Sequence, residues 1–358
     1  MINVLICVPS LKNQGAERFT TELAIKLDRA FFNPIVLVAG VCDTNSNNYS
    51  LLRMSNIEII DVSNMNVVKQ TATIRRLLFK KQIDVIHSNL GSCFRLFIPN
   101  LLYKRVPHIL TIHSMGNRIF SGRKKRLASF LFRTKQVIPV AICDTVKKSM
   151  VETYHLKDED IELVYNGVDV TKHQYIERAA DDTVRYISVG ALYNIKNYSF
   201  LIDAFNILQQ TCCNVKLDII GTGEQKDQLQ TKIEELGLRD KIKLLGNQDN
   251  VFDYLKKADV YCCSSLVEGL PLSVLEAMAT GLPVVSSNAG GVVDIVKNEL
   301  NGFIVELKIQ EYVDALQKMT EYPIRLKYGI KSREIAESHS IEKMAVQYQQ
   351  IYRKRLKL

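Results

Sequence analysis

Short apolar runs alternate with amphipathic stretches along almost the whole chain, and this alternation limits the possible folds more than any other feature. Several runs are apolar on both faces, whereas the stretches between them, such as residues 67–79, carry a helical period. Strands that are buried on both faces belong to parallel sheets that helices cover on both sides. The first half therefore predicts a doubly wound α/β domain with strands at residues 3–8, 35–39, 57–61, 85–87, 108–112 and 137–142.

The alternation pauses once and then resumes, which predicts a second domain of the same kind. Residues 166–169 are typical of a turn, and residues 171–183 are polar without periodicity, as in a linker. A chain of 358 residues has room for two such cores. We expect the domains at residues 1–168 and 169–340, with ligands at the carboxyl ends of their strands. The strands predicted for the second domain are residues 185–189, 215–220, 241–244, 259–263 and 283–286.

The net charge of +9 comes from one part of the sequence. Between Asp84 and Asp144 there are ten basic residues and no acidic one, so the rest of the chain is nearly neutral. Residues 118–133 interleave cations with large apolar side chains, a pattern typical of surfaces that bind anionic membranes. A solvated face and a nucleic-acid patch are the alternatives, but no nucleic-acid-binding motif accompanies the charge, so we expect no nucleic-acid partner. The residues predicted to face a membrane are Arg118, Arg123, Lys124, Lys125, Arg126 and Phe130.

The cysteines and the apolar runs predict a cytoplasmic protein. The eight cysteines include no Cys-x-x-Cys pair and no Cys/His cluster with zinc-ligand spacing, so we expect reduced thiols, Cys213 among them. No apolar run approaches the roughly 20 residues of a membrane-spanning helix, and residues 1–9 lack the basic start of a signal peptide. An Asp-x-Asp sequence occurs at Asp158 and Asp160, in an acidic loop, and we expect neither a metal nor a cofactor.

The segment from Glu268 to Val285 contains the strongest functional motif. A predicted strand, a Gly/Pro loop and a predicted helix at residues 272–279 follow one another. Gly269 allows a tight turn, and the free amides at the start of the helix, where the helix dipole is positive, suit a phosphate. Glu276, one turn inside the helix, could point into the cleft and accept both hydroxyls of a ribose, and Glu268 suits the hydroxyls of a sugar. For two isolated glutamates, a solvated helix residue and ordinary strand–loop–helix packing would be the better interpretation.

Two glutamates separated by seven residues and followed by Ala-Met-Ala-Thr-Gly-Leu-Pro-Val-Val resemble the signature of the retaining GT-B glycosyltransferases of family 4. The resemblance implies two Rossmann-like domains facing each other across a cleft, with residues 341–358 as a terminal helix that packs back on the first. It implies retaining transfer of a hexosyl or N-acetylhexosaminyl group from a nucleotide-sugar, most simply a UDP-sugar. The implied acceptor is a lipid-linked or other saccharide in capsule, exopolysaccharide or lipopolysaccharide synthesis, at the inner face of the cell membrane.

The resemblance also implies roles for single residues. Glu276 would bind the donor ribose, Glu268 the transferred sugar and Lys196 the donor phosphates, while His113 would lie beside the donor sugar. By themselves, a loop lysine and a histidine at a strand end are usually solvated or structural, and His87, which also ends a predicted strand, could be either structural or part of the cleft. The other residues implied in donor binding are Gly190, Gly221, Asn247, Gly269, Leu270, Leu272 and Ser273, and those implied at the loop between donor and acceptor are Gln14, Gly15 and Ala16.

Two positions depart from the family pattern. Many members carry an arginine directly after the glycine of Gly190, where this chain has Ala191, so one of the two usual phosphate cations is missing. Gln14 replaces the first of two glycines before the helix of the first domain, which puts the acceptor pose in doubt. These departures keep a non-catalytic, membrane-associated partner protein open as an alternative, beside a nucleotide-sugar epimerase of the same fold.

A nicotinamide-dependent oxidoreductase is the alternative from a different class of enzyme. Gly221 and Gly223 form a Gly-x-Gly sequence after a predicted strand, as in dinucleotide-binding domains. The third glycine of that motif is absent, because Lys226 occupies its position. This alternative is therefore the weakest of the three.

Overall fold

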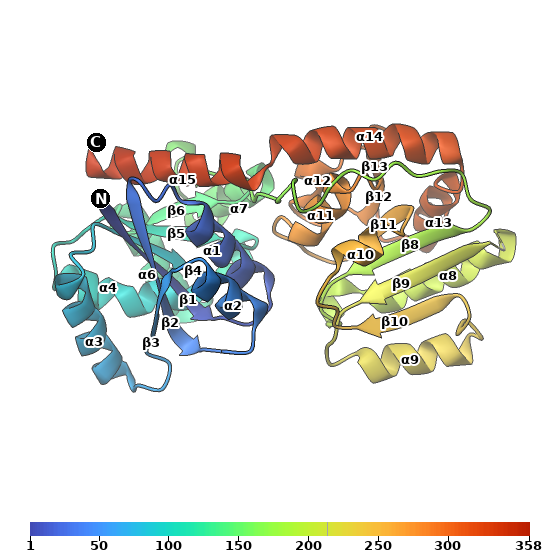
Figure 1. The fold of residues 1–358 in the computed structure, drawn as a ribbon. Coiled ribbons are helices and arrows are strands. Elements are labelled where there is room, and N and C mark those ends of the chain that lie inside the picture. Colours follow the sequence, from blue (N-terminus) through green and yellow to red (C-terminus); the bar gives the residue numbers. More distant parts are fainter. Residues whose placement is uncertain (213) are drawn as a thin grey trace. The chain divides into compact units, whose positions relative to one another are not determined.

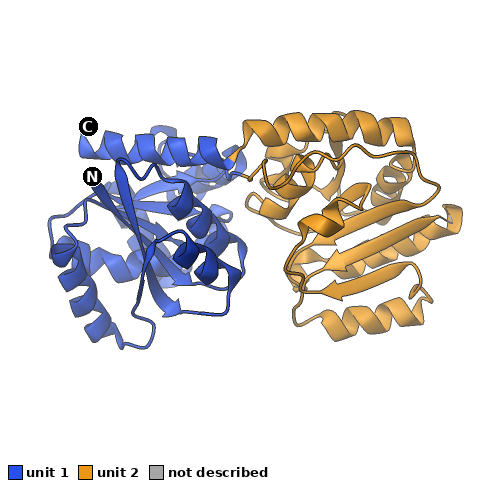
Figure 2. Cartoon of the chain, in the orientation of Figure 1, with its two compact units in different colours: residues 1–167, 341–358 blue, residues 168–340 orange. Residues whose placement is uncertain are grey.

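The structure is a computed structural model that describes residues 1–212 and 214–358, and the chain divides into two units (Figure 1). Unit 1 consists of residues 1–167 and 341–358, and unit 2 consists of residues 168–340 (Figure 2). Cys213, expected to be a reduced thiol, lies outside the described residues. Cys7 and Cys93 are buried in unit 1, and burial raises the pKa of each thiol to about 12, so both are protonated at neutral pH.

A parallel sheet forms the centre of unit 1. Its seven strands are β1 (Ile2–Ser10), β2 (Phe32–Val41), β3 (Glu58–Asp61), β4 (Val85–Asn89), β5 (His108–Ile112), β6 (Ile138–Ala141) and β7 (Glu162–Leu163). They lie in the order β3-β2-β1-β4-β5-β6-β7, and Val4 of β1 pairs with Pro34 of β2 and with Val85 of β4. The sheet therefore grows outward in both directions from the β1–β4 pair. This confirms the doubly wound α/β fold predicted for the first half.

Helices cover both faces of this sheet. They are α1 (Gly15–Lys26), α2 (Asn47–Met54), α3 (Val67–Lys80), α4 (Cys93–Leu101), α5 (Gly116–Ile119), α6 (Gly122–Arg133), α7 (Asp144–Tyr154) and α15 (Ile341–Leu356). Successive side chains of a strand point to opposite faces, so β1 supplies two cores. Val4 and Ile6 belong to the core that includes residues of α1, α2 and α15, whereas Leu5 and Cys7 belong to the core that includes residues of α3 and α4.

The last helix, α15, packs on unit 1 through one buried stripe that includes Tyr348 and Tyr352. The Tyr352 hydroxyl lies 2.6 Å from Nδ1 of His87, and Oγ1 of Thr111 lies 2.7 Å from Nε2 of the same ring. His87 is 0% exposed, and burial lowers its pKa to about 3. Both ring nitrogens are thus used inside the core, so His87 has a structural role.

Unit 2 contains a second parallel sheet. Its strands are β8 (Val184–Val189), β9 (Val215–Ile220), β10 (Ile242–Gly246), β11 (Val260–Cys263), β12 (Val284–Ser287) and β13 (Gly302–Val305), in the order β10-β9-β8-β11-β12-β13. Here the order reverses between β8 and β11. The helices are α8 (Tyr198–Thr211), α9 (Lys226–Glu235), α10 (Phe252–Leu255), α11 (Leu272–Ala279), α12 (Val292–Ile295), α13 (Ile309–Lys318) and α14 (Tyr322–Ser338).

The segment after residue 168, expected to be a linker, is fixed to unit 2. Arg333 of α14 donates to the carbonyl oxygen of His173 at 2.7 Å. Arg178 donates to the carbonyl oxygens of Thr280, at 2.9 Å, and of Leu255, at 3.1 Å. Hydrogen bonds from two arginine side chains therefore hold this polar segment against the rest of unit 2.

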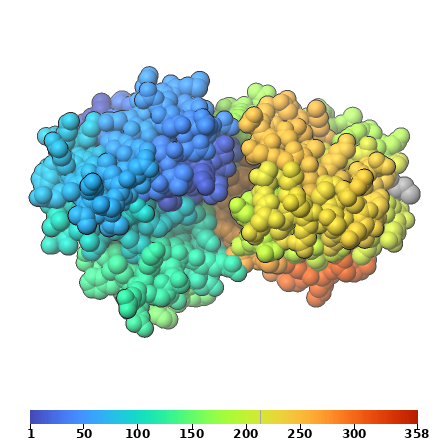
Figure 3. All heavy atoms as spheres, turned by 90° about the horizontal axis from the view of Figure 1, so that it is seen from below, coloured from blue at the N-terminus to red at the C-terminus, as the bar shows by residue number. Residues whose placement is uncertain are grey.

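None of the helices in the described ranges combines the length and the apolar character that crossing a membrane requires. The outer surface of unit 2 seen in Figure 3 is formed in part by the yellow stretch that contains α9. Exposed positions on this helix are polar, and its buried residues are Leu229 and Ile233. It is thus an ordinary amphipathic surface helix.

We predict that two substitutions of Tyr352 destabilise unit 1 by different amounts. Tyr352→Phe keeps the ring but removes the partner of His87 Nδ1, which should cost about 1–3 kcal/mol. Tyr352→Ala also leaves a cavity, and buried aromatic-to-alanine changes cost about 3–5 kcal/mol. Urea unfolding followed by circular dichroism measures both, with the exposed Gln350→Ala on the same helix as the control. Equal stability of Tyr352→Phe and the wild type would contradict the proposed role of the hydroxyl.

Candidate functional site

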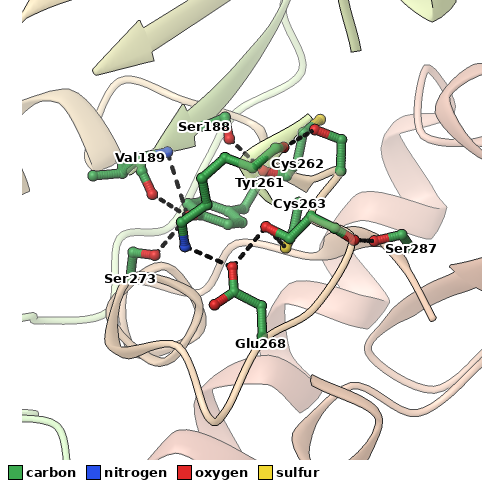
Figure 4. Close-up of polar contacts among 11 residues, drawn as sticks. Ser188, Val189, Tyr261, Cys262, Cys263, Glu268, Ser273 and Ser287 are labelled. Atoms are coloured by element: carbon green, nitrogen blue, oxygen red, sulfur yellow. Dashed lines mark hydrogen bonds and ion pairs between the residues drawn. The ribbon is translucent and has the colours of Figure 1, made fainter. Parts of the chain in front are cut away.

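A pocket lies in unit 2 at the carboxyl ends of β8 and β11, where the strand order reverses. Open α/β sheets bind ligands at this position, because the loops after the two strands run in opposite directions. The pocket contains about 220 Å³ of empty volume. Figure 4 shows polar contacts of side chains from β8, β11 and the loop and helix that follow β11. The lining includes Ser188, Lys196, Tyr261, Ser265, Glu268 and Ser273.

An ion pair joins two loops of this pocket. Lys196 ends the short 3-10 turn η3 (Asn194–Lys196) after β8, and its Nζ donates to Oε1 of Glu268 at 2.6 Å. Ser265 Oγ donates to the same oxygen, also at 2.6 Å. Burial alone would lower the pKa of Lys196, but the Glu268 carboxylate outweighs burial and raises that pKa. Lys196 is therefore a full cation at neutral pH, held by a carboxylate that a serine orients.

The first turn of α11 borders the pocket through Ser273. The buried Tyr261 hydroxyl hydrogen-bonds at 2.9 Å to Oγ of Ser273 and lies 3.2 Å from the carbonyl oxygen of Val189. One hydroxyl thus connects β8, β11 and the helix. Pro271 precedes the helix and makes no side-chain hydrogen bond to its amides. Pro271 therefore leaves the positive end of α11 uncapped by its own side chain, which suits an anionic ligand.

The glycines of this region allow the loops to approach each other closely. Gly221 has φ +144°, and a Cβ at this position would overlap the carbonyl oxygen of Gly190. The loops after β8 and β9 are therefore in backbone contact, which accounts for Gly221 without a ligand, whereas a Cβ at Gly190 would lie 2.9 Å from the Tyr198 hydroxyl. On the other side of the pocket, the amide of Gly291 donates to the carbonyl oxygen of Glu268 at 3.4 Å. Gly269 and the buried Leu270 continue the loop that leads into α11.

Glu276 occupies a more buried position than we expected from its place in the motif. Its side chain was expected to face a cleft, but the residue is 4% exposed and lies within α11. Its Oε1 atom is 3.7 Å from Nε2 of His173, which is also buried. Sequence reasoning missed His173, because this histidine belongs to the polar segment expected to be a linker.

Unit 1 places His113 at the carboxyl end of β5, next to the end of β4. Its Nε2 lies 2.8 Å from Oδ1 of Asn89, and the Phe19 ring packs edge-on at a centroid distance of 4.9 Å. Because an amide oxygen only accepts hydrogen bonds, this contact assigns the proton to Nε2 and leaves Nδ1 as an acceptor. Burial lowers the pKa of His113 to about 3, so the ring is neutral at pH 7. Sequence reasoning missed Asn89, whose only signal was its position at a strand end.

The loop predicted to lie between donor and acceptor follows β1. Gln14 and Gly15 are exposed, Ala16 is half-buried, and a Cβ at Gly15 would meet no described atom within 4 Å. Packing within the chain therefore does not require glycine at position 15. The next residue, Glu17, is buried and accepts a hydrogen bond from Oγ of Ser10, which fixes the start of α1 to the end of β1.

The predicted membrane-facing residues lie on α5 and α6. Arg123, Lys124, Arg126 and Phe130 are exposed on α6, and Arg118 is exposed on α5. Lys125 is half-buried, with its Nζ 6.0 Å from the centre of the Tyr154 ring. The surface therefore presents four exposed cations beside one exposed aromatic ring, with Lys125 turned partly inward.

The predicted site residues thus fall into two groups. Lys196, Glu268 and Ser273 border the pocket of unit 2, whereas Asn247 is exposed at the end of β10 and is not part of the lining. His113 and residues 14–16 belong to unit 1. Among residues 1–212 and 214–358, no three His, Cys, Asp or Glu side chains are grouped as a metal site would require.

Comparison with known proteins identifies the family. The model of Glycosyltransferase Family 4 matches residues 13–172, and the model of Glycosyl transferases group 1 matches residues 169–336. The two matches meet at the boundary between the units and together cover most of the chain. The chain therefore belongs to the group 1, family 4 glycosyltransferases.

Individual relatives are similar over most of their length. The UDP-Gal:alpha-D-GlcNAc-diphosphoundecaprenol alpha-1,3-galactosyltransferase of Escherichia coli is 26% identical over 285 residues, which cover 73% of this chain and 72% of that enzyme. The capsular polysaccharide biosynthesis glycosyltransferase CapH of Staphylococcus aureus is 26% identical over 303 residues, or 80% and 82% of the two chains. The crystal structure of Anabaena HepE with UDP and glucose has a TM-score of 0.84 at 20% identity and covers 98% and 99%. The structural likeness confirms the predicted GT-B fold.

We predict that unit 1 loses stability as the pH falls below about 6.5. The pKa values of His87 and His108 are lowered to about 3 by burial, so the folded state keeps both rings neutral while the unfolded state protonates them. Between pH 6 and 5, each ring should therefore remove up to about 1.4 kcal/mol of stability per pH unit. His108→Asn should reduce this slope, and the exposed His155→Asn should not. Urea midpoints measured across this range test the prediction, and an unchanged slope in His108→Asn would contradict it.

Proposed function

We propose that this glycosyltransferase moves a hexosyl or N-acetylhexosaminyl group, with retention, from a UDP-sugar to a lipid-linked or other saccharide acceptor. The observation that carries the proposal is the pocket at β8 and β11, where a lysine, a carboxylate and an uncapped helix N-terminus meet. The relatives named for galactosyl transfer to a diphosphoundecaprenol-linked sugar and for capsular polysaccharide biosynthesis support this class of acceptor. The product would enter capsule, exopolysaccharide or lipopolysaccharide synthesis.

The donor diphosphate would lie between Lys196 and the first amides of α11, those of Leu272 and Ser273. Among the described residues that line the pocket, Lys196 is the only cation, and Ala191 adds none beside it. An ammonium group has three N–H donors, so Lys196 can bind a phosphate oxygen while it keeps Glu268 as a partner. The helix amides then carry a larger share of the phosphate charge than they would beside a second cation.

Transfer requires stabilisation of the nucleoside diphosphate as it leaves. Preorganised donors such as the Lys196 ammonium and the α11 amides stabilise the charge that develops on the phosphates, and we propose that they do so without a metal or cofactor. Glu268, oriented by Ser265, would accept hydrogen bonds from hydroxyls of the transferred sugar. Glu276 would bind the ribose, and backbone groups near Asn247 would contact the base.

Residues of unit 1 also have roles in the proposed function. His113 would contact the donor sugar as a neutral imidazole, because its pKa is lowered to about 3 and Asn89 engages Nε2. Gln14, Gly15 and Ala16 would border the acceptor, and the open space at Gly15 leaves room for a ligand. The exposed cations of α6 would bind an anionic bilayer, and this contact would place the enzyme at the inner face of the cell membrane.

The first test measures nucleotide release from a panel of UDP- and GDP-sugars, with and without membrane lipid extract. We expect one UDP-sugar to give lipid-dependent release. Glu276→Ala should reduce this release at least about tenfold, because charged hydrogen bonds contribute about 1.5–3 kcal/mol each. The matched control is the exposed Glu234→Ala on α9, which should keep wild-type release.

Each other outcome supports a different activity. Conversion of a nucleotide-sugar into its epimer without an acceptor would indicate an epimerase. Absence of binding and turnover for every donor, with or without lipid, would favour a non-catalytic partner protein. Analysis of the anomeric configuration of the product distinguishes retention from inversion, and activity in excess chelator tests independence from metal.

We predict that the exposed cations of α6 bind anionic membranes and that this binding weakens with salt. The triple variant Arg123→Gln, Lys124→Gln and Arg126→Gln removes three cations, each of which contributes about 1 kcal/mol near an anionic surface, so binding should weaken about 100-fold. Co-sedimentation with vesicles of phosphatidylcholine and phosphatidylglycerol measures this. The control neutralises the exposed Lys308, Lys318 and Lys327 of unit 2 in the same way. Equal losses in the two triple variants would show that net charge, not the α6 surface, determines binding.

A further inference from the structure

A second exposed surface on unit 1 lies outside the donor pocket and outside α6. Phe79, at the end of α3, is 49% exposed, and Ile98, Leu101 and Leu102, at the end of α4, are 53%, 40% and 53% exposed. We call these four residues the apolar ridge. Large exposed apolar groups of this kind mark interaction surfaces when polar residues surround them.

Ring contacts and side-chain hydrogen bonds fix both ends of the apolar ridge. Phe79 packs edge-on against Tyr103 at a centroid distance of 4.7 Å, and Arg75 lies 5.3 Å from the centre of the Phe79 ring. The loop after α4 is pinned by Asn100, whose side chain bonds both the amide and the carbonyl oxygen of Val106, at 3.0 and 2.9 Å. The exposed side chains of Leu101 and Leu102 are therefore presented by a fixed backbone.

Cations surround the ridge. Arg75, Arg76 and Lys80 are exposed on α3, and Lys104 and Arg105 are exposed after α4. Residues 62–143 contain fifteen basic residues and a single acidic one, Asp84. The carboxylate of Asp84 accepts a hydrogen bond from the amide of Asn3 at 2.9 Å and so belongs to the strand end rather than to the ridge. The segment that forms α3, α4 and α6 is thus strongly positive, although Glu58 of β3 pairs with Lys81, directly after α3, at 2.7 Å.

A contact between two aromatic rings joins α4 to the segment that precedes α6. Phe94 of α4 packs edge-on against Phe120, which directly precedes α6, with ring centroids 4.8 Å apart. Figure 3 shows the light-blue, cyan and teal stretches, which contain α3, α4 and α6, beside one another on the visible face of unit 1. One membrane could therefore contact both surfaces.

We propose that the apolar ridge inserts into an anionic bilayer and that the cations around it bind the lipid headgroups. This deepens the proposed membrane contact of α6 and rests on it. Aliphatic side chains enter the boundary between headgroups and acyl chains, whereas Lys and Arg stay at headgroup depth. A second copy of the chain is disfavoured as the occupant, because a two-fold interface would place these cations opposite one another. A nucleic acid would match the charge but not the aliphatic side chains.

The two surfaces should respond differently to salt. Binding through the α6 cations is screened, because the Debye length falls to about 3 Å at 1 M ionic strength. Burial of the ridge in acyl chains does not depend on charge and should persist. We therefore expect the wild type to keep a salt-resistant part of its vesicle binding that Ile98→Ser combined with Leu102→Ser removes, with at least a tenfold loss in affinity in 1 M salt.

The absence of tryptophan from the chain allows a direct test. Leu102→Trp places a single fluorophore on the ridge, and Val346→Trp places one on the exposed face of α15, where Val346 is 49% exposed. With vesicles of equal parts phosphatidylcholine and phosphatidylglycerol, we expect a blue shift and quenching by brominated acyl chains for Leu102→Trp. The emission of Val346→Trp should stay unchanged, and thermal melting checks that both variants fold.

The outcomes separate the two proposals. Vesicle binding with no change in Leu102→Trp emission would overturn the insertion of the ridge and leave the α6 contact standing. Failure of the wild type to bind vesicles at any salt concentration would overturn both. A Leu102→Trp response caused by duplex DNA, or by self-association seen in sedimentation, would assign the ridge to those partners instead and would also overturn the proposal.

Discussion

The need to bury two parallel sheets on both faces determines most of this structure. Parallel strands require crossover connections, and these connections are the helices that cover each sheet. Where the strand order reverses, at β1 and β4 and again at β8 and β11, the adjacent crossovers leave toward opposite sides. The ends of these strands and the loops that follow them carry Ser10, Asn89, Lys196 and Glu268, the polar residues around which both candidate sites are built.

The donor pocket balances its charge internally before any ligand binds. A cation that is partly withdrawn from water requires a partner, and Glu268 provides one for Lys196 at 2.6 Å. In the proposed function, a donor diphosphate would share this lysine, and with Ala191 in place of an arginine the α11 amides would be the second source of positive charge.

Much of the fold could be predicted because apolar runs encode parallel strands directly. The bounds of β5, β9 and α11 agree with the prediction, whereas β13 and α14 were missed. β13 has only four residues, and α14 buries Arg325, Gly329 and Ser332 among its apolar residues, so it has no clear apolar stripe. The site was predicted only where a motif is contiguous. The contacts of Asn89 with His113 and of His173 with Glu276 join distant segments, so they depend on the completed fold.

The placement of α15 has a consequence for how the chain is made. Tyr348 and Tyr352 complete the core of unit 1, yet they are synthesised after all of unit 2. Because chains emerge from the ribosome N-terminus first, the core of unit 1 stays incomplete, with an open apolar face, until α15 has emerged. Unit 2 is continuous in sequence and can close earlier. The first unit in the sequence is therefore the last to be completed. A nascent-chain chaperone would act on the apolar face of unit 1 that α15 later covers.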